Sequence, residues 1–201
     1  MEYNTKLILQ YVPEGAVSAL LALLNEQKVM VKIVNRRQTK HGDFRKLPNG
    51  HFQITINNNL NPYQFLLTLV HEIAHHITYQ RYGRVKAHGR EWKKTFQHLM
   101  LPFLNTAVYP DNMLGLLANY LKNPKASTDS DVKLSLALRE TRAESGKSFI
   151  FELPLNTIFV FKRKKYQRGA KKRTRYECLQ VDSKRVYLFH HNAEVTIYEE
   201  Q

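Results

Sequence analysis

The segment from Asn61 to Gly83 limits the possible folds of this chain more than any other part of the sequence. Asn61 is a favourable helix N-cap, Pro62 suits the first helical position, and Gly83 is a typical C-terminal stop. Apolar side chains recur between them at helical spacing, and they are Phe65, Leu66, Leu69, Val70, Ile73 and Ile77. The sequence therefore predicts a helix from Tyr63 to Tyr82 with one broad buried face.

The motif His71-Glu72-Ile73-Ala74-His75 lies in the middle of this predicted helix. Side chains four positions apart share one helical face, so His71 and His75 can direct imidazole nitrogens at the same metal ion. Glu72 can reach a water on that metal and act as its general base. A chance match is expected in roughly one of a hundred or more sequences of this length. The mid-helix position nevertheless favours a site for one zinc ion.

A third histidine, His88, follows His75 by thirteen positions, where the predicted helix has ended and the chain can fold back. Three protein ligands with one open position are typical of catalytic zinc. His76 points about 100° away from His75 on the helix, so it is interpreted as a surface group or a neighbour of the ligands. His98 is expected on a solvated helix face, and Trp92 is expected in the core.

Further elements are predicted around this helix. Helices are expected at 13–27, from 90 to about 100 or 104, at 111–121 and, within a polar stretch, at 132–139. β-Branched and alternating patterns predict strands at 29–36 and 51–57, and we expect a small antiparallel sheet of two or three strands. Residues 1–122 therefore form the first predicted domain, of the α+β class, and residues 123–147 form a polar connector.

Residues 148–201 have a different pattern and are predicted to form a small, basic, β-rich domain. Short alternating stretches predict strands at 149–153, 157–161, 174–181, 186–190 and 193–198. Several short strands in so few residues are typical of a small barrel or a curled sheet.

The charge of the chain indicates a polyanionic partner. Lys and Arg number 31 against 17 Asp and Glu, a formal net charge of +14. Residues 162–175 contain nine Lys or Arg among fourteen positions and no acidic residue. This basic tract is interpreted either as a DNA contact, with single strands included because Tyr166 and Tyr176 can stack on bases, or as a solvated hairpin loop. The candidate contacts are Lys162, Arg163, Lys164, Lys165, Arg168, Lys171, Lys172, Arg173 and Arg175. Acidic proteins are an alternative partner.

The composition also bears on location. Cys178 is the single cysteine, which excludes an intramolecular disulfide and a Cys-rich zinc ribbon and fits a reducing compartment. No stretch approaches the roughly 18 apolar residues of a membrane span. The apolar run Ala16 to Leu24 follows acidic residues rather than a basic leader. We therefore expect a cytoplasmic protein without a membrane partner, associated with the nucleoid if it binds DNA.

The order of these motifs resembles the SprT-like domain, the zinc metalloprotease fold shared with Spartan. The resemblance covers about residues 15 to 105 and rests on the segments VKIVNRRQTKHGDFR, ITINNNL, LVHEIAHH and AHGREWKKTFQHLM. It implies a zincin-like catalytic domain with His71, His75 and His88 as zinc ligands and Glu72 as the catalytic acid/base. It also implies a role linked to DNA repair, since Spartan-type members cleave proteins crosslinked to DNA.

The sequence departs from one pattern of this family. Many bacterial SprT-like proteins have a C-terminal zinc ribbon, which the lone Cys178 cannot form here. The basic tract is therefore the best remaining candidate for holding DNA.

Two classes of function follow from the sequence. The leading hypothesis is a zinc-dependent metallopeptidase, a hydrolase that acts on DNA-associated or DNA-crosslinked proteins. The competing hypothesis is a nucleic-acid-binding regulatory protein whose zinc site is structural or vestigial. A third hypothesis keeps the metal enzyme but gives it a substrate other than protein.

Overall fold

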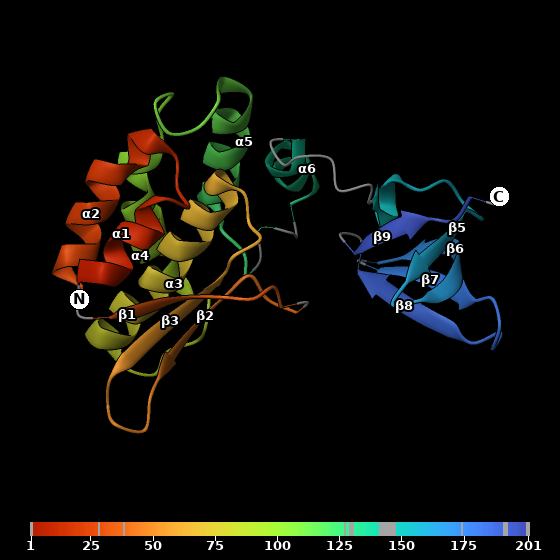
Figure 1. The fold of residues 1–201 in the computed structure, drawn as a ribbon, viewed down its shortest axis with the longest axis horizontal. Coiled ribbons are helices and arrows are strands. Elements are labelled where there is room, and N and C mark those ends of the chain that lie inside the picture. The colour runs from red at the N-terminus through yellow and green to blue at the C-terminus, as the bar shows by residue number, and fades with distance from the viewer. Residues whose placement is uncertain are drawn as a thin grey trace. The chain divides into compact units, whose positions relative to one another are not determined.

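The computed structural model describes residues 2–27, 29–37, 39–126, 128, 131–140, 148–173, 175–190 and 193–199. The chain divides into two compact units, Met1–Thr141 and Arg142–Gln201 (Figure 1). Unit 1 combines helices with a small sheet and unit 2 is rich in β-strands, which confirms the α+β class and the separate β-rich C-terminal region. The last part of the predicted connector, residues 141–147, lies outside the described residues.

The helices of unit 1 follow the predicted ones closely. They are α1 (Glu2–Leu9), α2 (Val17–Glu26), α3 (Pro62–Tyr82), α4 (Arg90–Met100), α5 (Asp111–Lys122) and α6 (Val132–Glu140), with 3-10 turns at Glu14–Ala16 and Leu101–Phe103. α1 was not anticipated, because Leu7, Ile8 and Leu9 are consecutive rather than spaced along one helical face. α6 contributes Leu134 and Leu138 to the buried core of unit 1.

The sheet of unit 1 is mixed, so the antiparallel prediction is wrong for one of its two pairings. Its strands are β1 (Met30–Val34), β2 (Gly42–Lys46) and β3 (Phe52–Asn57), in the order β1-β3-β2. β2 and β3 pair antiparallel, whereas β1 and β3 pair parallel. The most buried strand, β3, takes the central position. β1 and β2 are less buried and lie at the edges. β2 is the third strand that the sequence left open.

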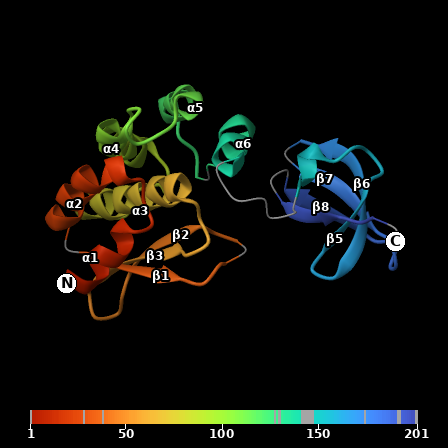
Figure 2. The same cartoon turned by 45° about the horizontal axis from the view of Figure 1, so that its top comes forward.

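Helix α3 lies across the sheet, and α4 packs on the side of α3 that faces away from the strands (Figure 2). The side chain of Asn61 accepts a hydrogen bond of 2.8 Å from the backbone N–H of Gln64, as expected of an N-cap. Gly83 ends the helix with a φ of +68°, a conformation that favours glycine. The long central helix thus has a favourable residue at each end.

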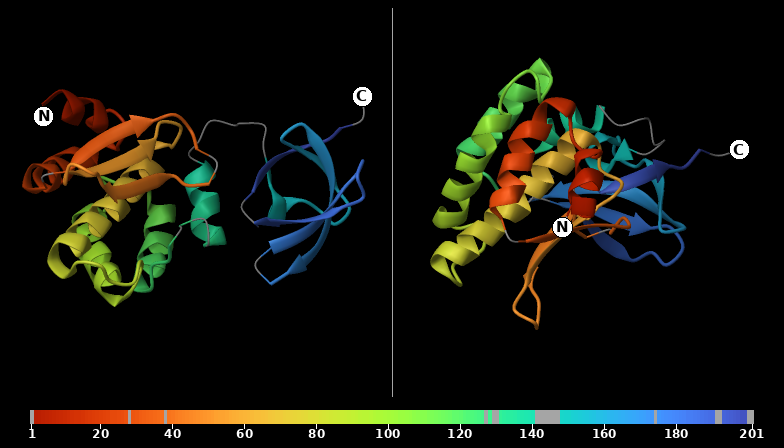
Figure 3. Two further views of the ribbon diagram at one scale, coloured as in Figure 1. Left: turned by 90° about the horizontal axis from the view of Figure 1, so that it is seen from below. Right: turned by 60° about the vertical axis from the view of Figure 1, so that its left-hand side comes forward.

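Unit 2 is a curled six-stranded sheet (Figure 3). Its strands are β4 (Ser148–Phe149), β5 (Ile158–Phe161), β6 (Lys164–Lys172), β7 (Arg175–Gln180), β8 (Val186–His190) and β9 (Glu194–Ile197), in the order β4-β9-β5-β6-β7-β8. A 3-10 turn, Ile150–Glu152, replaces most of the strand predicted at 149–153. A small cluster that includes Phe159, Tyr166 and Cys178 fills the inside of the sheet.

Strand β6 is the main difference from the predicted pattern in unit 2. It occupies most of the basic tract, which the alternative interpretation treats as a loop. Its backbone pairs with β5 on one side and with β7 on the other. Backbone pairing with both neighbours thus makes this segment a strand, although its charged side chains do not predict one. None of the described helices has the length and apolar character that crossing a bilayer requires.

Candidate metal centre

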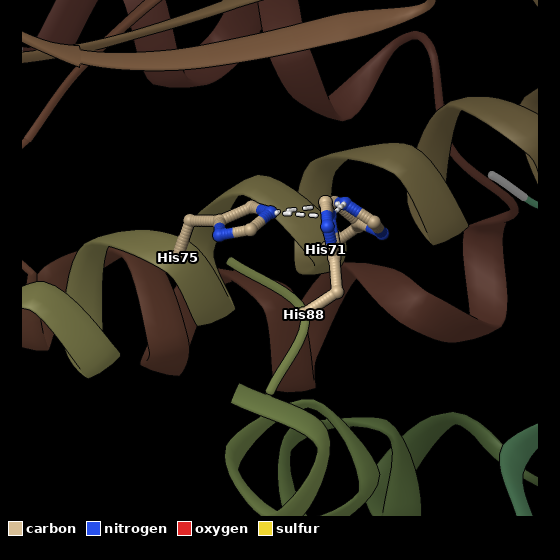
Figure 4. Close-up of side chains that lie close together, drawn as sticks. All are labelled: His71, His75 and His88. Carbon is tan, nitrogen blue, oxygen red and sulfur yellow. Dashed lines mark hydrogen bonds between the residues drawn. The ribbon is translucent and has the colours of Figure 1, made fainter. Parts of the chain in front are cut away.

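Three histidine rings of unit 1 point toward a common position. Nε2 of His71 lies 3.2 Å from Nε2 of His75 and 3.2 Å from Nε2 of His88, and the last two atoms are 2.9 Å apart. Figure 4 shows His71 and His75 on successive turns of α3, with His88 reaching them from the segment that follows the helix. Within the described parts of the chain, this is the cluster of side chains able to hold a metal ion.

The triangle of nitrogens fits an ion of the size of zinc. With Zn–N distances of about 2.0–2.1 Å, two ligands of a tetrahedral ion lie about 3.3 Å apart. The three observed separations approach this value. Since the cluster contains three donors among the described residues, a fourth position is left for water or substrate. Imidazole nitrogens also suit copper, iron and nickel, so the donors fit a metal without naming it.

The electrostatic surroundings keep these rings in the form that binds metal. Burial, and then the neighbouring His75 and His88, holds the pKa of His71 well below its usual value. Burial, followed by His88, lowers the pKa of His75 to about 4. Burial, followed by Lys93, also lowers the pKa of His88. The rings are therefore neutral at pH 7, and a neutral imidazole can donate its lone pair to a metal.

The backbone places His88 through a tight turn. The N–H of Gly89 donates a 2.9 Å hydrogen bond to the carbonyl oxygen of Lys86, and His88 has a φ of +56° within that turn. A Cβ at position 89 would lie 2.8 Å from the same carbonyl oxygen, so the turn requires glycine there for space. The left-handed conformation of His88 is unusual for a residue with a side chain, and such strain is typical of functional positions.

Trp92 forms an aromatic wall behind the three rings. Its ring centroid lies 4.6 Å from those of His71 and His88 and 5.2 Å from that of His75. The indole is 1% exposed and stacks on Phe96 at 5.0 Å. The expected core position of Trp92 is confirmed. Its contact with all three rings was not anticipated, because it depends on how α4 packs against α3.

Glu72 lies beside the histidines and is 7% exposed. Burial, reinforced by Asp43, raises the pKa of its carboxyl to about 8, although Arg37, Lys40 and a hydrogen bond from the backbone of Phe44 act in the opposite direction. Glu72 and His71 line a cavity of about 190 Å³ together with Arg37, residues 39–42 and Thr68. The carboxyl group thus borders a space next to the metal centre that can admit part of a substrate.

The strand edge at Gly42 fixes the position of Glu72. A Cβ added to Gly42 would lie 2.6 Å from Oε1 of Glu72 and 2.8 Å from its Cγ. The glycine therefore permits a close approach of β2 to α3 that a side chain would block. The sequence contains this glycine in a polar stretch, where it indicated only a break between strands.

Hydrogen bonds join two residues that line the cavity, Arg37 and Lys40, to β3. Nε of Arg37 donates to Oδ1 of Asn57 at 2.9 Å, and Nη1 donates to Oγ1 of Thr55 at 2.9 Å. Nδ2 of Asn57 donates to the carbonyl oxygen of Lys40 at 2.8 Å. Asn57 is 1% exposed. A polar residue at the end of an apolar strand was the sequence signal that could have identified it, because a buried polar group needs hydrogen-bond partners.

The other two histidines near the motif lie outside the cluster. His76 is fully buried and packs against the rings of Phe44 and Phe52, so the interpretation as a surface group is wrong. The reason is that β2 and β3 cover the face of α3 that His76 occupies. His98 is exposed on α4, as expected.

The nine cations of the basic tract all lie in unit 2, and they have different environments. Nζ of Lys165 lies 3.6 Å from the ring centroid of Tyr198, and the guanidinium of Arg168 lies 4.4 Å from that of Tyr176. Nζ of Lys172 forms a 2.9 Å ion pair with Glu177. The remaining six are exposed, and they are Lys162, Arg163, Lys164, Lys171, Arg173 and Arg175.

Comparisons with known proteins point to one family. A sequence profile of the SprT-like family matches residues 10–109, a range that contains the three histidines and Glu72. Protein SprT of Vibrio parahaemolyticus is 45% identical over 58 residues, which are 27% of this chain and 35% of that protein. Protein SprT of Actinobacillus succinogenes is 56% identical over 34 residues, which are 16% of this chain and 20% of that protein. The matches thus span about a third or less of these relatives. No solved structure matches the chain significantly.

Proposed function

The chain belongs to the SprT-like family through its residues 10–109, and we propose that it is a zinc-dependent metallopeptidase with a zincin-like catalytic unit. The observation that carries the proposal is the triangle of Nε2 atoms from His71, His75 and His88, with the buried carboxyl of Glu72 next to it. Three neutral nitrogen donors, an open position and an adjoining carboxyl group are the parts that metal-assisted peptide hydrolysis needs.

The residues of the chain have separate roles in this proposal. His71, His75 and His88 hold the zinc ion, which supplies a Lewis acid that polarises a carbonyl group and lowers the pKa of water. Glu72 accepts the proton of the attacking water and passes it to the departing amine. A pKa close to the working pH suits a group that both accepts a proton and passes it on. Trp92 keeps the three rings in place and excludes water behind them.

The proposed substrates are proteins associated with DNA or crosslinked to it. The support comes from unit 2, where the exposed cations of the basic tract provide a surface for a polyanion. In this arrangement unit 2 binds the DNA, and unit 1 cleaves the protein that the DNA carries.

A Glu72→Gln variant tests the chemistry. Gln keeps the shape of the side chain but cannot accept the proton, so cleavage of a DNA-crosslinked protein is expected to fall by about 10²- to 10⁴-fold. The zinc content, measured by atomic absorption, is expected to stay at one ion per chain. The matched control is Glu26→Gln, an exposed position at the end of α2, which should cleave at the normal rate. Normal cleavage by Glu72→Gln protein contradicts the proposed mechanism.

The second candidate is a nucleic-acid-binding regulator with a structural metal site. It is favoured by the cations of unit 2, which lie in a compact unit of their own. Stoichiometric zinc without any cleavage of crosslinked or unfolded protein, with and without DNA, would support this function over the peptidase.

A further inference from the structure

The turns of unit 2 contain cations in an unusual backbone conformation. Lys162, Arg163, Arg173 and Lys184 have φ values of +51°, +65°, +57° and +55°. Among the described residues, the other non-glycine residues with positive φ are Asn156, which tolerates this region, and the histidine His88 of the metal centre. In unit 1 the strained position thus belongs to a site residue, and in unit 2 most of the strained positions are Lys or Arg.

The turn between β5 and β6 shows this most clearly. Phe161 pairs with Lys164, so the two residues between them, Lys162 and Arg163, form the whole connection. A two-residue hairpin turn with positive φ at both positions has the type I′ pattern, for which Asn-Gly is the preferred sequence. Lys and Arg are unfavourable there for the backbone. Residues in sparsely populated conformations cluster at ligand-binding positions, so the exposed charges of Lys162 and Arg163 indicate an anion as the ligand.

The exposed cations gather at the two ends of β6. The first rim consists of Lys162, Arg163, Lys164, Lys184 and Arg185, all exposed. Its two turns are neighbours, since the N–H of Val181 donates to the carbonyl oxygen of Lys165 at 3.0 Å. The second rim lies at the turn between β6 and β7 and consists of Lys171, Arg173 and Arg175, also exposed.

The separation of the rims defines the kind of anion that they fit. A strand rises about 3.3 Å per residue, so the two ends of β6 lie about 26 Å apart along an extended strand. A small anion cannot contact both rims, whereas a polymer with closely spaced charges can. Nucleic acid carries one charge about every 3.4 Å along each strand, whatever its sequence. An acidic protein would need an unusually long run of Asp and Glu to do the same.

We propose that the two rims of unit 2 bind the phosphate backbone of a nucleic acid, with Lys162 and Arg163 as direct phosphate contacts. The inference names the surface for the DNA association of the proposed function and rests on that part of it, not on the peptidase chemistry. It also divides the cations of the basic tract into those that contact phosphate groups and those that do not. Lys165 and Arg168 are half-buried against aromatic rings at 3.6 and 4.4 Å, and Lys172 is paired with Glu177, so these three are not counted among the phosphate contacts. Nζ of Lys162 lies farther from its aromatic neighbour, 5.5 Å from the ring centroid of Phe161, and this side chain is exposed.

The test uses the full chain with Lys162→Asn combined with Arg163→Gly. This pair removes both charges and installs the residues that the turn prefers, so unit 2 is expected to stay folded. Binding to a fluorescein-labelled 20-mer, single-stranded and duplex, is measured by anisotropy across a salt series. We expect roughly ten- to fiftyfold weaker duplex binding at 0.1 M salt, and a salt slope reduced by about 1.8. The matched control is Lys94→Gln with Lys133→Gln, two exposed helical positions of unit 1 with the same loss of charge.

Each outcome decides the inference. Weaker binding and a smaller slope in the turn variant alone support it. Unchanged binding, or equal weakening in the control variant, overturns it, and so does poly-glutamate that competes as well as DNA of equal charge. Cleavage of a DNA-free unfolded protein is measured in parallel. If the turn variant binds DNA normally and also cleaves normally, only this inference fails. If the wild-type protein shows no cleavage while the turn variant binds DNA more weakly, only the peptidase proposal is contradicted.

Discussion

The two units use a similar backbone device for different ends. In unit 1 the left-handed His88 turns its ring inward, where it meets two other rings against the buried Trp92. In unit 2 the left-handed Lys162 and Arg163 are exposed at the tip of a hairpin. The site of unit 1 is therefore part of its core, whereas the proposed site of unit 2 is separate from its core. Substitutions should change fold and function together in unit 1 and separately in unit 2.

The largest expected effect is that of Trp92→Ala. Truncating a fully buried aromatic residue leaves a cavity and typically costs about 3–5 kcal/mol in the free energy of unfolding. The rings of His71, His75 and His88 also lose their common support, so zinc binding should weaken in the same variant. Hydrogen exchange followed by mass spectrometry should show faster exchange in α3 and α4 and no change in β5 to β8.

The conservative variant Trp92→Phe serves as the control for this prediction. It keeps an aromatic ring against the histidines, so it should retain most of the zinc affinity and lose less stability than Trp92→Ala. Faster exchange in unit 2 of the Trp92→Ala protein would show that the two units share their stability, and the comparison would then be wrong.

Gly42→Ala tests the contact between β2 and the carboxyl group of Glu72. The new Cβ would lie 2.6 Å from Oε1 of Glu72, so the carboxyl group or the strand has to move. A displacement of about 1 Å in a reacting group can lower the rate by about 100-fold, and a loss of this size is expected in cleavage assays. Zinc content should be normal, because the methyl group meets Glu72 and Thr68 rather than the histidines.

Gly50→Ala is the matched control for the strand substitution. Gly50 lies in the turn between β2 and β3, has open space around its Cα, and has a φ of +82°. Alanine at position 50 strains the turn but does not contact Glu72 or the histidines. Cleavage by Gly50→Ala protein should be normal, and a rate equal to that of Gly42→Ala would mean that general loss of stability explains both.

These contacts show which parts of the site the sequence could predict. The caps at Asn61 and Gly83 and the four-residue spacing of His71 and His75 are local, and local periodicity is sufficient to predict α3 and its ligand face. The contacts of Trp92, Gly42 and Arg37 join segments that are far apart in the chain. They depend on how helices and strands pack, and no pattern within one segment contains that information.

The same reasoning explains the differences in the two sheets. β1 pairs parallel with β3, and neither strand order nor strand direction is encoded in the alternation of either strand. β6 is a strand although Tyr166 is its one large apolar residue, because its backbone groups are paired on both sides. Side-chain patterns reveal a strand through its buried apolar residues. A strand whose outer face is cationic has too few buried apolar residues to be detected in this way.

The pH dependence of stability in the metal-free protein is a smaller effect, and it is expected in unit 1. Burial raises the pKa of Glu72 to about 8, so the folded protein holds a proton that the unfolded chain releases above about pH 4.5. The free energy of unfolding of unit 1 should therefore fall as the pH rises from about 6.5 to 8, by at most about 1.4 kcal/mol per pH unit.

The histidines of the site act in the opposite direction at lower pH. Burial lowers the pKa of His75 to about 4, so between about pH 4 and 6.5 the unfolded chain binds a proton that the folded protein does not. The pKa values of His71 and His88 are lowered as well, so the three histidines together outweigh Glu72, and stability should rise over that range to a maximum near pH 6.5. In Glu72→Gln protein the fall above pH 6.5 should disappear, and the rise below it should become steeper because the opposing effect of Glu72 is gone. A fall of the same size in the variant would contradict the assignment to Glu72.

The smallest expected effect compares two neighbouring cations of unit 2, Arg163 and Lys164. Arg163→Gly relieves a left-handed residue and should raise the free energy of unfolding of unit 2 by about 0.5–1 kcal/mol. Lys164→Gly removes the same charge from a strand position and should lower it by about 0.5–1 kcal/mol. Both variants should weaken nucleic-acid binding, because both remove a cation of the first rim. Stability is measured by urea unfolding and binding by anisotropy. If the two variants change stability in opposite directions but both weaken binding, unit 2 gives up stability for charge at its turns. If Arg163→Gly destabilises unit 2, the arginine stabilises the turn by a contact of its own, and the contrast with His88 no longer holds.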